Sequence, residues 1–313
     1  MAVGKPSLTT GGAQKGRWAA DGVMVLVVVI WGLNNVIMKA ALQGWVSPLA
    51  FNSIRFPIGA LAMVTLMLVI EKDWRLPWNL FARVAALGLM GNAVNQVLFT
   101  NGLNLTTASN AGAISAVLPI LAALIGSVTG LDRSTPRLWL GAIVSFGGIL
   151  MVTLLGGHGF GGFRTGDLLL LGAATVWAGY TVFSGPLARQ ASPLKVTAYA
   201  MGVASVAVFL LGLPQLVHQD FSQISRVSWG GLLFAALFSN AAAYGMYVWV
   251  IHRMGSTRAS MFNNLAPVIT ALAAWVFLGE RWLGWQWLGV ALVMVGVLLA
   301  RWDVIMASLR RGG

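Results

Sequence analysis

Residues 139–148 read WLGAIVSFGG, and residues 287–296 read WLGVALVMVG. Both stretches begin with Trp-Leu-Gly and end with glycine, and one constant offset relates every position of the first to the second. The same offset relates Asn92 to Asn240 and Pro119 to Pro267, while SPLAFNSIRF at 47–56 matches SPLKVTAYAM at 192–201 at a slightly shorter one. Self-similarity over so long a stretch indicates that one structural unit occurs twice in the chain.

The composition shows what kind of unit this is. Of the 313 residues, 58% are hydrophobic and 9% are charged, whereas a soluble domain carries roughly 25% charged residues. This apolar excess excludes a soluble enzyme, a disordered chain and a DNA-binding domain as descriptions of the whole chain. The net charge of +12 comes from basic residues scattered over short loops, so we expect no nucleic-acid partner. The chain has no cysteine, and we expect neither a metal nor a cofactor.

The apolar segments predict an all-α integral membrane protein, because a bilayer core takes about 20 mostly apolar residues per helix. Five such segments fall in each copy of the repeat. Since five is odd, the second copy enters the membrane from the opposite face, which gives ten transmembrane helices as two inverted five-helix repeats. The predicted helices cover 22–42, 48–70, 82–103, 107–130, 137–155, 166–187, 194–213, 228–251, 256–279 and 285–302.

This division gives four regions along the chain. Residues 1–20 form a flexible tail, 21–156 and 165–302 form the two repeats, and 303–313 form a second tail. Most lysines and arginines fall on the side that holds both tails, and Arg164, Arg226 and Arg281 fall on the other side. Positive charge marks the cytoplasmic side, so we expect a multi-pass protein of a bacterial inner membrane with both termini cytoplasmic.

Several motifs resemble one known group of membrane proteins. They are WGLNNVIMKAAL (31–42) followed by SPLAFNSIRF, then GDLLLLGAATVWAGYTVFS (166–184), STRASMFNNLAPVITALAAWVFLGERW (256–282) and WLGVALVMVGVLL (287–299). Together they resemble the drug/metabolite transporter superfamily, specifically its EamA-type ten-helix exporters, over about residues 20–303. Within that group the chain is most similar to bacterial exporters of aromatic and other neutral amino acids.

The resemblance implies a secondary transporter that exports amino acids by alternating access and is not an enzyme. A drug or other metabolite exporter on the same fold is the alternative. A membrane-embedded enzyme needs an acid–base pair, a nucleophile with its base or a metal cluster, and none is visible in the spans. A structural subunit is a further alternative, which the repeat does not favour. Small multidrug members of the superfamily use a glutamate in their first helix, and VIWGLNNVIMK has no acid there, so facilitated diffusion or exchange is favoured over carboxylate-based proton antiport.

Two basic residues lie inside predicted helices, and both are candidates for binding a substrate carboxylate. They are Lys39 and Arg55, on the outer half of the first two helices. A charged side chain within the membrane is a functional candidate by default. The alternatives are that Lys39 snorkels to the interface and that Arg55 caps loop carbonyls.

Amide and aromatic side chains complete the predicted substrate site. Asn92, Asn95 or Gln96 lie at depths that match Asn240 and Tyr244 in the second repeat, as expected for a site at the repeat interface. Helix–helix hydrogen bonding is the alternative for the amides, and packing is the alternative for the aromatic residues. The remaining candidates are Trp31, Asn34, Asn35, Asn101, Trp177, Tyr180 and Asn263.

Two prolines are candidates for hinges, and two glycine-rich helices are candidates for close helix packing. Pro119 and Pro267 occupy equivalent places within their helices and are predicted to act as hinges, with a static bend as the alternative. The fifth and tenth helices are rich in small residues, so we expect them to brace the bundle or to form a dimer contact. The expected partners are therefore an amino-acid substrate and membrane lipid, with the chain a monomer or a weak homodimer.

Overall fold

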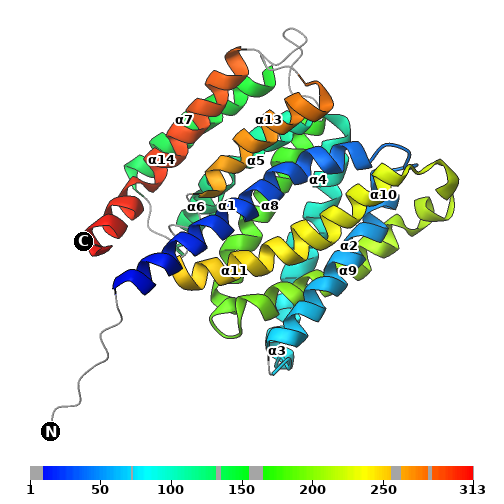
Figure 1. Cartoon of the computed structure of the whole chain (residues 1–313), viewed down its shortest axis with the longest axis horizontal. Coiled ribbons are helices and arrows are strands. Elements are labelled where there is room, and N and C mark those ends of the chain that lie inside the picture. Colours follow the sequence, from blue (N-terminus) through cyan, green and yellow to red (C-terminus); the bar gives the residue numbers. More distant parts are fainter. Residues whose placement is uncertain are drawn as a thin grey trace.

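The computed structural model describes residues 10–71, 73–131, 135–154, 165–254, 262–280 and 284–312, and all regular structure in them is helical (Figure 1). The helices of the first half are α1 (Thr10–Ala41), α2 (Pro48–Ile70), α3 (Trp78–Gly88), α4 (Val94–Leu105), α5 (Ala108–Ser115), α6 (Leu118–Val128) and α7 (Pro136–Leu154). Those of the second half are α8 (Thr165–Ala188), α9 (Pro193–Val217), α10 (Arg226–Leu233), α11 (Ala243–Met254), α13 (Ala266–Leu278) and α14 (Gly284–Gly312).

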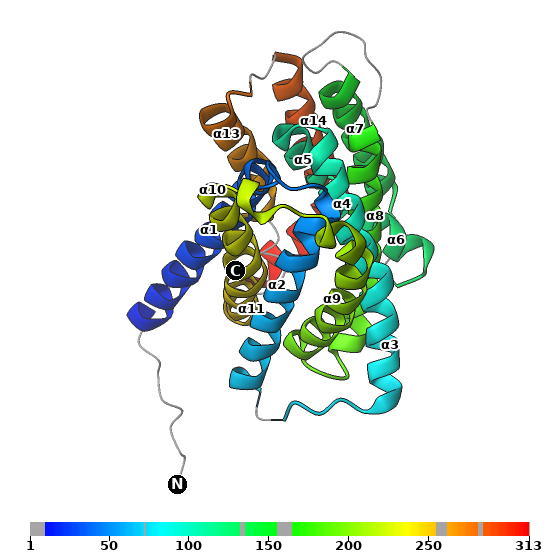
Figure 2. The ribbon, with the colours of Figure 1, turned by 90° about the vertical axis from the view of Figure 1, so that its right-hand side faces the viewer.

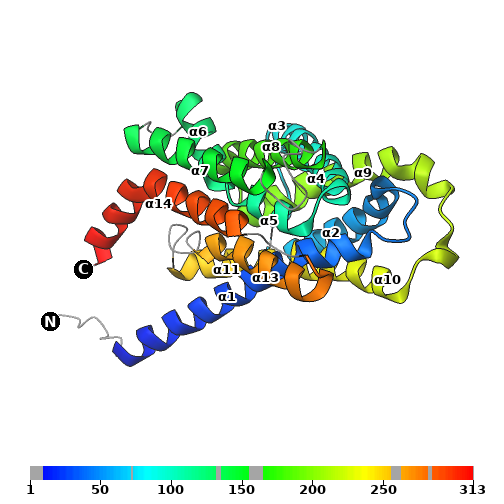
Figure 3. The ribbon, with the colours of Figure 1, turned by 90° about the horizontal axis from the view of Figure 1, so that it is seen from above.

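Length and composition suit many of these helices to a membrane. Within the described residues, six helical stretches are long and apolar enough to cross one: Ala19–Ala41, Pro48–Ile70, Ala108–Val128, Thr165–Ala188, Pro193–Val217 and Arg226–Val250. Shorter apolar helices cover Pro136–Val152, Ala266–Leu278 and Gly284–Ala300. All of them coincide with predicted spans, so the all-α membrane fold is confirmed. The helix α1 begins and α14 ends on the same side of the bundle (Figures 1 and 3).

The repeated Ser-Pro dipeptide begins the second helix of each half. The Ser47 hydroxyl accepts a hydrogen bond from the backbone N–H of Ala50, and the Ser192 hydroxyl accepts one from Lys195. The proline that follows each serine needs no hydrogen-bond partner in the first turn and has its φ angle preset for a helix. The two helices so started, α2 and α9, pack against each other, and α3 lies against α9 (Figure 2).

The quoted glycine stretches form the contact between α7 and α14, which lie side by side (Figure 1). A Cβ atom on Gly148 would lie 2.5 Å from the carbonyl oxygen of Gly289, and one on Gly289 would lie 2.7 Å from the carbonyl oxygen of Gly148. Gly141 meets Gly296 in the same way. In the repeat, Gly289 is equivalent to Gly141 and Gly296 is equivalent to Gly148. Each glycine of α7 therefore contacts the equivalent of the other glycine of α7, so the two helices run antiparallel about a pseudo-two-fold axis, as an inverted repeat requires.

Irregular segments also recur at equivalent places in the two halves. A π-helical segment, Leu89–Ala93, joins α3 to α4, and another, Phe234–Ala242, joins α10 to α11. A short break separates α5 from α6, and a 3₁₀ turn at Asn263–Leu265 precedes α13. A second 3₁₀ turn, Phe221–Gln223, follows α9. The π segments and breaks were not predicted, because their cause is local hydrogen bonding rather than hydrophobic pattern.

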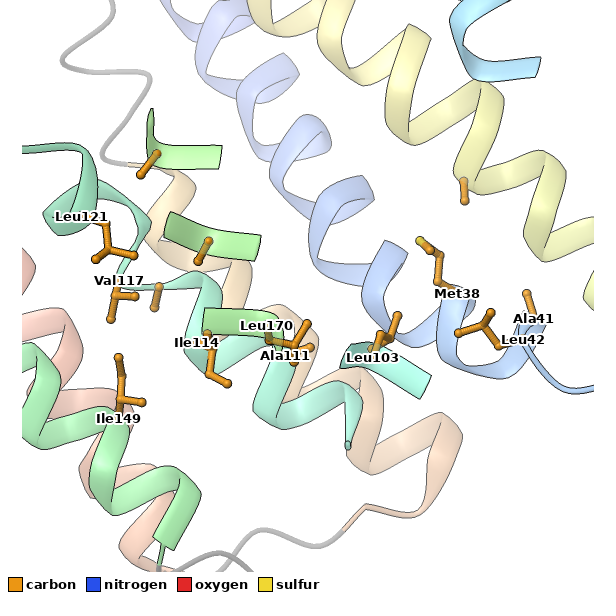
Figure 4. Packing of buried hydrophobic residues seen from close by; sticks show 14 of the residues in the cluster. Met38, Ala41, Leu42, Leu103, Ala111, Ile114, Val117, Leu121, Ile149 and Leu170 are labelled. Atoms are coloured by element: carbon orange, nitrogen blue, oxygen red, sulfur yellow. The ribbon is translucent and has the colours of Figure 1, made fainter. Parts of the chain in front are cut away.

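The largest apolar cluster fixes the first-half helices against α8 (Figure 4). It contains Met38 of α1, Leu103 of α4, Ile114 of α5, Ile149 of α7 and Leu170 of α8, all of them buried. In a bilayer the hydrophobic effect does not favour helix association, so such interdigitated packing carries much of the contact energy. This cluster positions the polar side chains of α4 described next.

Candidate functional site

Arg55 lies in α2 about two turns from its start and is almost wholly buried, with 2% of its surface exposed. Its Nε donates a hydrogen bond to Oδ1 of Asn52 at 3.0 Å, and its Nη2 donates to Oε1 of Gln96. Asn52 donates from Nδ2 to the Gln96 carbonyl oxygen at 3.0 Å and to Oγ1 of Thr100 at 2.7 Å. The guanidinium is therefore held between α2 and α4 by amide groups. Asn52, three residues before Arg55, was not predicted.

The positive charge of Arg55 is not balanced by an acidic side chain of the described residues. Among the described residues, no carboxylate lies within ion-pairing distance of the guanidinium. Within the same part of the chain its Nη1 makes no hydrogen bond, which leaves one arm of the planar fork open. Moving an ion out of water costs several kcal/mol unless an opposite charge accompanies it. A carboxylate ligand would supply that charge with matching bidentate geometry.

Asn92 and Asn240 lie in the two π-helical segments and are equivalent in the repeat. Both Nδ2 atoms are buried, and neither has a hydrogen-bond partner among the described residues. A Cβ atom on Gly59 of α2 would lie 2.7 Å from the Asn240 Nδ2, so glycine at that position allows the amide to approach α2. π-helical turns occur frequently at functional sites, and here they present two unsatisfied amides to the interior.

Tyr180 of α8 contributes a third unsatisfied group. Its buried hydroxyl makes no hydrogen bond of normal geometry in the described part of the chain, but the side chains of Asn92 and Thr197 are near enough to interact with it electrostatically. Thr197 of α9 forms a 2.6 Å hydrogen bond with the hydroxyl of Tyr244. Helices of both repeats therefore bring hydroxyl and amide groups together. Among these residues, Asn92 was predicted only by its depth, and Thr197 was not predicted.

The aromatic candidates Trp31, Trp177 and Tyr180, which together would form an aromatic wall of the site, are divided between two places. Trp177 stacks on Tyr180, with ring centroids 5.0 Å apart and planes inclined by 22°. Trp31 instead meets Tyr247 edge to face at 5.2 Å, and its indole N–H donates to the Ser239 carbonyl oxygen at 3.2 Å. Trp31 and Trp177 belong to different apolar clusters. The stacked pair beside Asn92 is the part of the wall that borders the polar groups.

Other predicted residues have partners within the protein. Asn95 donates to the Ala173 carbonyl oxygen at 2.9 Å, and Asn101 donates to Val97 of its own helix at 2.8 Å. Asn35 donates to Thr270 Oγ1, and Asn34 donates to the Met38 sulfur, both at 3.4 Å. The Oδ1 atoms of Asn34 and Asn263 are buried and have no partner among the described residues. Substrate roles for this group stay predictions.

Lys39 lies in the last turn of α1, and its ammonium group caps the C-terminal end of α4. Its Nζ donates to the carbonyl oxygens of Leu103 at 2.9 Å and Asn104 at 2.8 Å, in the last turn of α4. A cation at a helix C-terminus satisfies free carbonyls and complements the helix dipole. This contact gives Lys39 a structural role, and its role in binding a substrate carboxylate stays a prediction.

The two predicted hinge prolines stand in a different setting from the one expected. They do not lie in the middle of a continuous helix: Pro119 is in the first turn of α6, and Pro267 is in the first turn of α13. Each follows an interruption of the helix. A proline in the first turn breaks no helical hydrogen bond, so the hinge role stays a prediction and shifts from a kink at proline to the interruption before it.

The turn between α4 and α5 is held by charged residues that were not predicted as a site. Both carboxylate oxygens of Glu280, just after α13, accept hydrogen bonds at 3.0 Å from the backbone N–H groups of Ala108 and Ser109. Asp167, fully buried in the first turn of α8, accepts from Thr106 at 2.6 Å and from Asn110 at 3.2 Å. With Lys39, these contacts form what we call the turn clamp: Lys39, Asp167 and Glu280 around residues 103–110.

The sequence did place Asp167 and Glu280 at helix ends, but a carboxylate at a helix end is usually solvated. Their burial depends on which neighbour covers each end, and hydrophobic pattern does not show that. The Leu-Gly-Glu turn at 278–280 was the available signal for Glu280. The clamp ties α1, α8 and the end of α13 to the turn between α4 and α5, at the end of the bundle where α1 terminates.

Glu280→Gln is expected to loosen the turn clamp. The change replaces one acceptor oxygen by an NH₂ group, so one backbone N–H of α5 loses a charge-assisted hydrogen bond, worth about 1.5–3 kcal/mol. Opening of the clamp should rise by at least about tenfold. Because the chain has no cysteine, the rate of thiol labelling at Ser109→Cys reports it. Glu71→Gln, at the start of the connection after α2, is the control and should leave labelling unchanged. Equal labelling with and without Glu280→Gln would contradict a closing role.

Known proteins support the architecture described above. The model of the EamA-like transporter family matches residues 18–154 and again 164–302, once for each half of the chain. The chain belongs to the EamA-like transporter family. It is therefore a multi-pass membrane protein of a transporter family, within the drug/metabolite transporter superfamily.

Individual relatives extend over nearly the whole chain. An uncharacterized transporter of Bacillus subtilis, YyaM, is 28% identical over 264 residues, which cover 82% of this chain and 85% of the relative. A probable terminal-alkyne amino-acid exporter of Streptantibioticus cattleyicolor is 26% identical over 286 residues, covering 91% and 93%. A solved crystal structure matches with a TM-score of 0.64 at 21% identity, covering 90% of this chain and 96% of the other. This structural match shows a shared fold.

Proposed function

We propose that this transporter exports amino acids, aromatic and other neutral ones, across a bacterial inner membrane. The carrying observation is the buried guanidinium of Arg55, which has an open Nη1 and no carboxylate partner in the described residues. An uncompensated cation inside a membrane protein marks a place where an anionic group binds. The α-carboxylate, common to all amino acids, suits this position, and the apolar and aromatic surroundings tolerate different side chains.

The family relationship supports this choice of substrate. One relative of similar length carries the description of a probable terminal-alkyne amino-acid exporter. The inverted repeat supports alternating access, since two equivalent halves can exchange conformations to open the site to either face. Asp167 and Glu280, two buried or capping carboxylates of the described chain, are engaged at helix ends. Facilitative transport or exchange therefore fits better than proton antiport through a carboxylate near Arg55.

Counterflow in liposomes tests the proposal directly. The purified full chain is reconstituted with an unlabelled amino acid inside and a labelled one outside, with and without a proton gradient. We expect phenylalanine and other neutral amino acids to exchange, and a proton gradient to leave the exchange rate unchanged. Exchange of drug cations in place of every amino acid would instead identify a drug exporter on the same fold.

Pro267→Ala tests the hinge role of the interruption before α13. Alanine lets the helix extend backwards through the 3₁₀ turn at Asn263–Leu265, because it restores the missing N–H donor and removes the steric restriction on residue 266. We expect turnover to fall several-fold while the half-saturating substrate concentration changes little, and Pro119→Ala should act alike. Pro57→Ala, in the continuous helix α2, is the comparison. Equal losses in turnover and binding would contradict a hinge.

A further inference from the structure

Several buried polar atoms make no hydrogen bond among the described residues, and three of them lie in the two π-helical segments and α8. These three are the Nδ2 atoms of Asn92 and Asn240 and the hydroxyl of Tyr180. A buried polar atom left unpaired costs about 1–3 kcal/mol, and the large majority of buried side-chain polar atoms in proteins have a hydrogen-bond partner. These three come from the two π-helical segments and from α8. Such a concentration indicates a place that is built to bind a ligand.

This group of residues is adjacent to Arg55. Asn92 lies four residues before Gln96, the residue that binds the Arg55 guanidinium. Gly59, which the Asn240 amide contacts, lies four residues after Arg55. Four residues of helix are about one turn, a rise of about 6 Å. Asn92 on the α4 side and Asn240 beside α2 therefore lie about one turn from the level at which Arg55 meets Gln96. A helical side chain leans towards the N-terminus of its helix, and Gln96 therefore leans towards Asn92.

The chemistry of the three groups is polar but uncharged. An amide side chain carries both donors and an acceptor oxygen, and turning it about its last bond exchanges them. The unpaired amide atoms are the Nδ2 donors, so both amides must turn to bind a cation. Once turned, two amide oxygens and one phenolic oxygen supply three acceptors, which equals the number of N–H donors on an ammonium group. A neutral set of acceptors binds an ammonium without neutralising Arg55, whereas an added carboxylate would compete with the substrate for the guanidinium.

We propose that Asn92, Tyr180 and Asn240 form an uncharged subsite that binds the α-ammonium group of the substrate beside the carboxylate bound to Arg55. The inference rests on the proposed function and narrows it, because the transporter then requires both groups on one carbon atom. α-Amino acids are accepted, while carboxylates that lack the amine and amines that lack the carboxylate are rejected.

A competition experiment on the full chain in liposomes separates the two subsites. Counterflow of labelled phenylalanine is inhibited by unlabelled phenylalanine, by 3-phenylpropionate, which lacks the amine, and by 2-phenylethylamine, which lacks the carboxylate. In the wild type we expect 3-phenylpropionate to be at least about tenfold weaker than phenylalanine, equivalent to losing one or two hydrogen bonds to a charged group.

Asn92→Ala and Asn240→Ala should each weaken phenylalanine about tenfold and leave 3-phenylpropionate unchanged, so that the gap between the two closes. Tyr180→Phe should act in the same direction. Thr175→Val is the control, because Thr175 is exposed on the same helix as Tyr180 and its hydroxyl donates to the Leu171 carbonyl oxygen of that helix. A merely structural role would weaken both ligands equally, and that result would overturn the inference.

Asn92→Asp gives a second, independent reading. A carboxylate here should raise the potency of 2-phenylethylamine, since it supplies a counter-charge for the amine. No gain for the amine would count against the subsite. Failure of the inference is distinguishable from failure of the proposed function: equal potencies of phenylalanine and 3-phenylpropionate defeat only the inference, whereas absence of amino-acid exchange by the wild type defeats both.

Discussion

Arg55→Gln should abolish amino-acid exchange while the protein remains folded. Glutamine keeps a hydrogen-bonding group near Asn52 and Gln96 but removes the charge. Truncating one partner of a buried charge pair costs about 2–5 kcal/mol of binding, which corresponds to at least about a thirtyfold loss of affinity. The empty protein should be as stable as the wild type or more so, because an uncompensated buried cation is itself destabilising. Counterflow and thermal unfolding in detergent measure the two effects.

Two further variants make this result specific. Arg55→Lys retains the charge but loses the planar fork, so we expect partial exchange with a weaker substrate affinity. Arg83→Gln removes a charge from the exposed surface of α3 and should change neither exchange nor stability. If Arg55→Gln instead unfolds the protein and the small folded fraction exchanges normally, Arg55 has a structural role and the carboxylate site is refuted.

Some features of the fold leave a signal in the sequence, and others do not. Trp, Gly and Pro recur at one offset, and their recurrence indicated two copies of a helical unit before any helix was located. Hydrophobic length placed the spans to within a few residues. The interruptions at 116–117 and Asn263–Leu265 and the two π segments change only local hydrogen bonding, so the hydrophobic pattern passes through them unchanged.

The candidate site was predictable where charge made it conspicuous. Arg55 is a basic residue in an apolar segment. Its burial, with no carboxylate of the described residues within ion-pairing distance, agrees with that signal. Amides gave a weaker signal, since a polar group in a membrane must find a partner whatever its role. Asn95 and Asn101 have such partners in backbone carbonyls, and Asn92 does not. Only the structure separates these cases, because the partners belong to distant segments or to the same helix.

The pseudo-symmetry of the frame does not extend to the charge. The repeat equivalent of Arg55 is Ala200, which is fully buried in α9. A Cβ atom on Gly88 of α3 would lie 2.8 Å from the Cα atom of Ala200, so the two backbones are in contact there. A side chain as long as arginine has no room at residue 200 in this arrangement. The charge of the proposed substrate site therefore comes from one repeat only, although the helices of the two repeats are related by a pseudo-two-fold axis. The glycine pairs of α7 and α14 maintain that helix arrangement.

Gly148→Leu is expected to prevent the α7–α14 pair from forming, the largest effect on folding that we predict. The carbonyl oxygen of Gly289 would lie 2.5 Å from the new Cβ atom, and the backbone nitrogen of Val293 would lie 2.8 Å from it. Both are main-chain atoms and cannot move aside as a side chain can. The helices must separate by more than an ångström, which also removes the 3.1 Å hydrogen bond from Ser145 to the Val293 carbonyl oxygen.

The adjacent residue provides a matched control for that substitution. A Cβ atom on Gly147 would have no neighbour within 4 Å, so Gly147→Leu adds the same volume to the same helix, one position away, without a clash. We expect Gly147→Leu to yield a monodisperse, heat-stable protein on size-exclusion chromatography, whereas Gly148→Leu aggregates or is degraded. In a bilayer a leucine on the surface of a helix is fully compatible with lipid. Similar folding of the two variants would mean that close approach of α7 and α14 does not hold the two repeats together, and the inverted-repeat frame would lose its central contact.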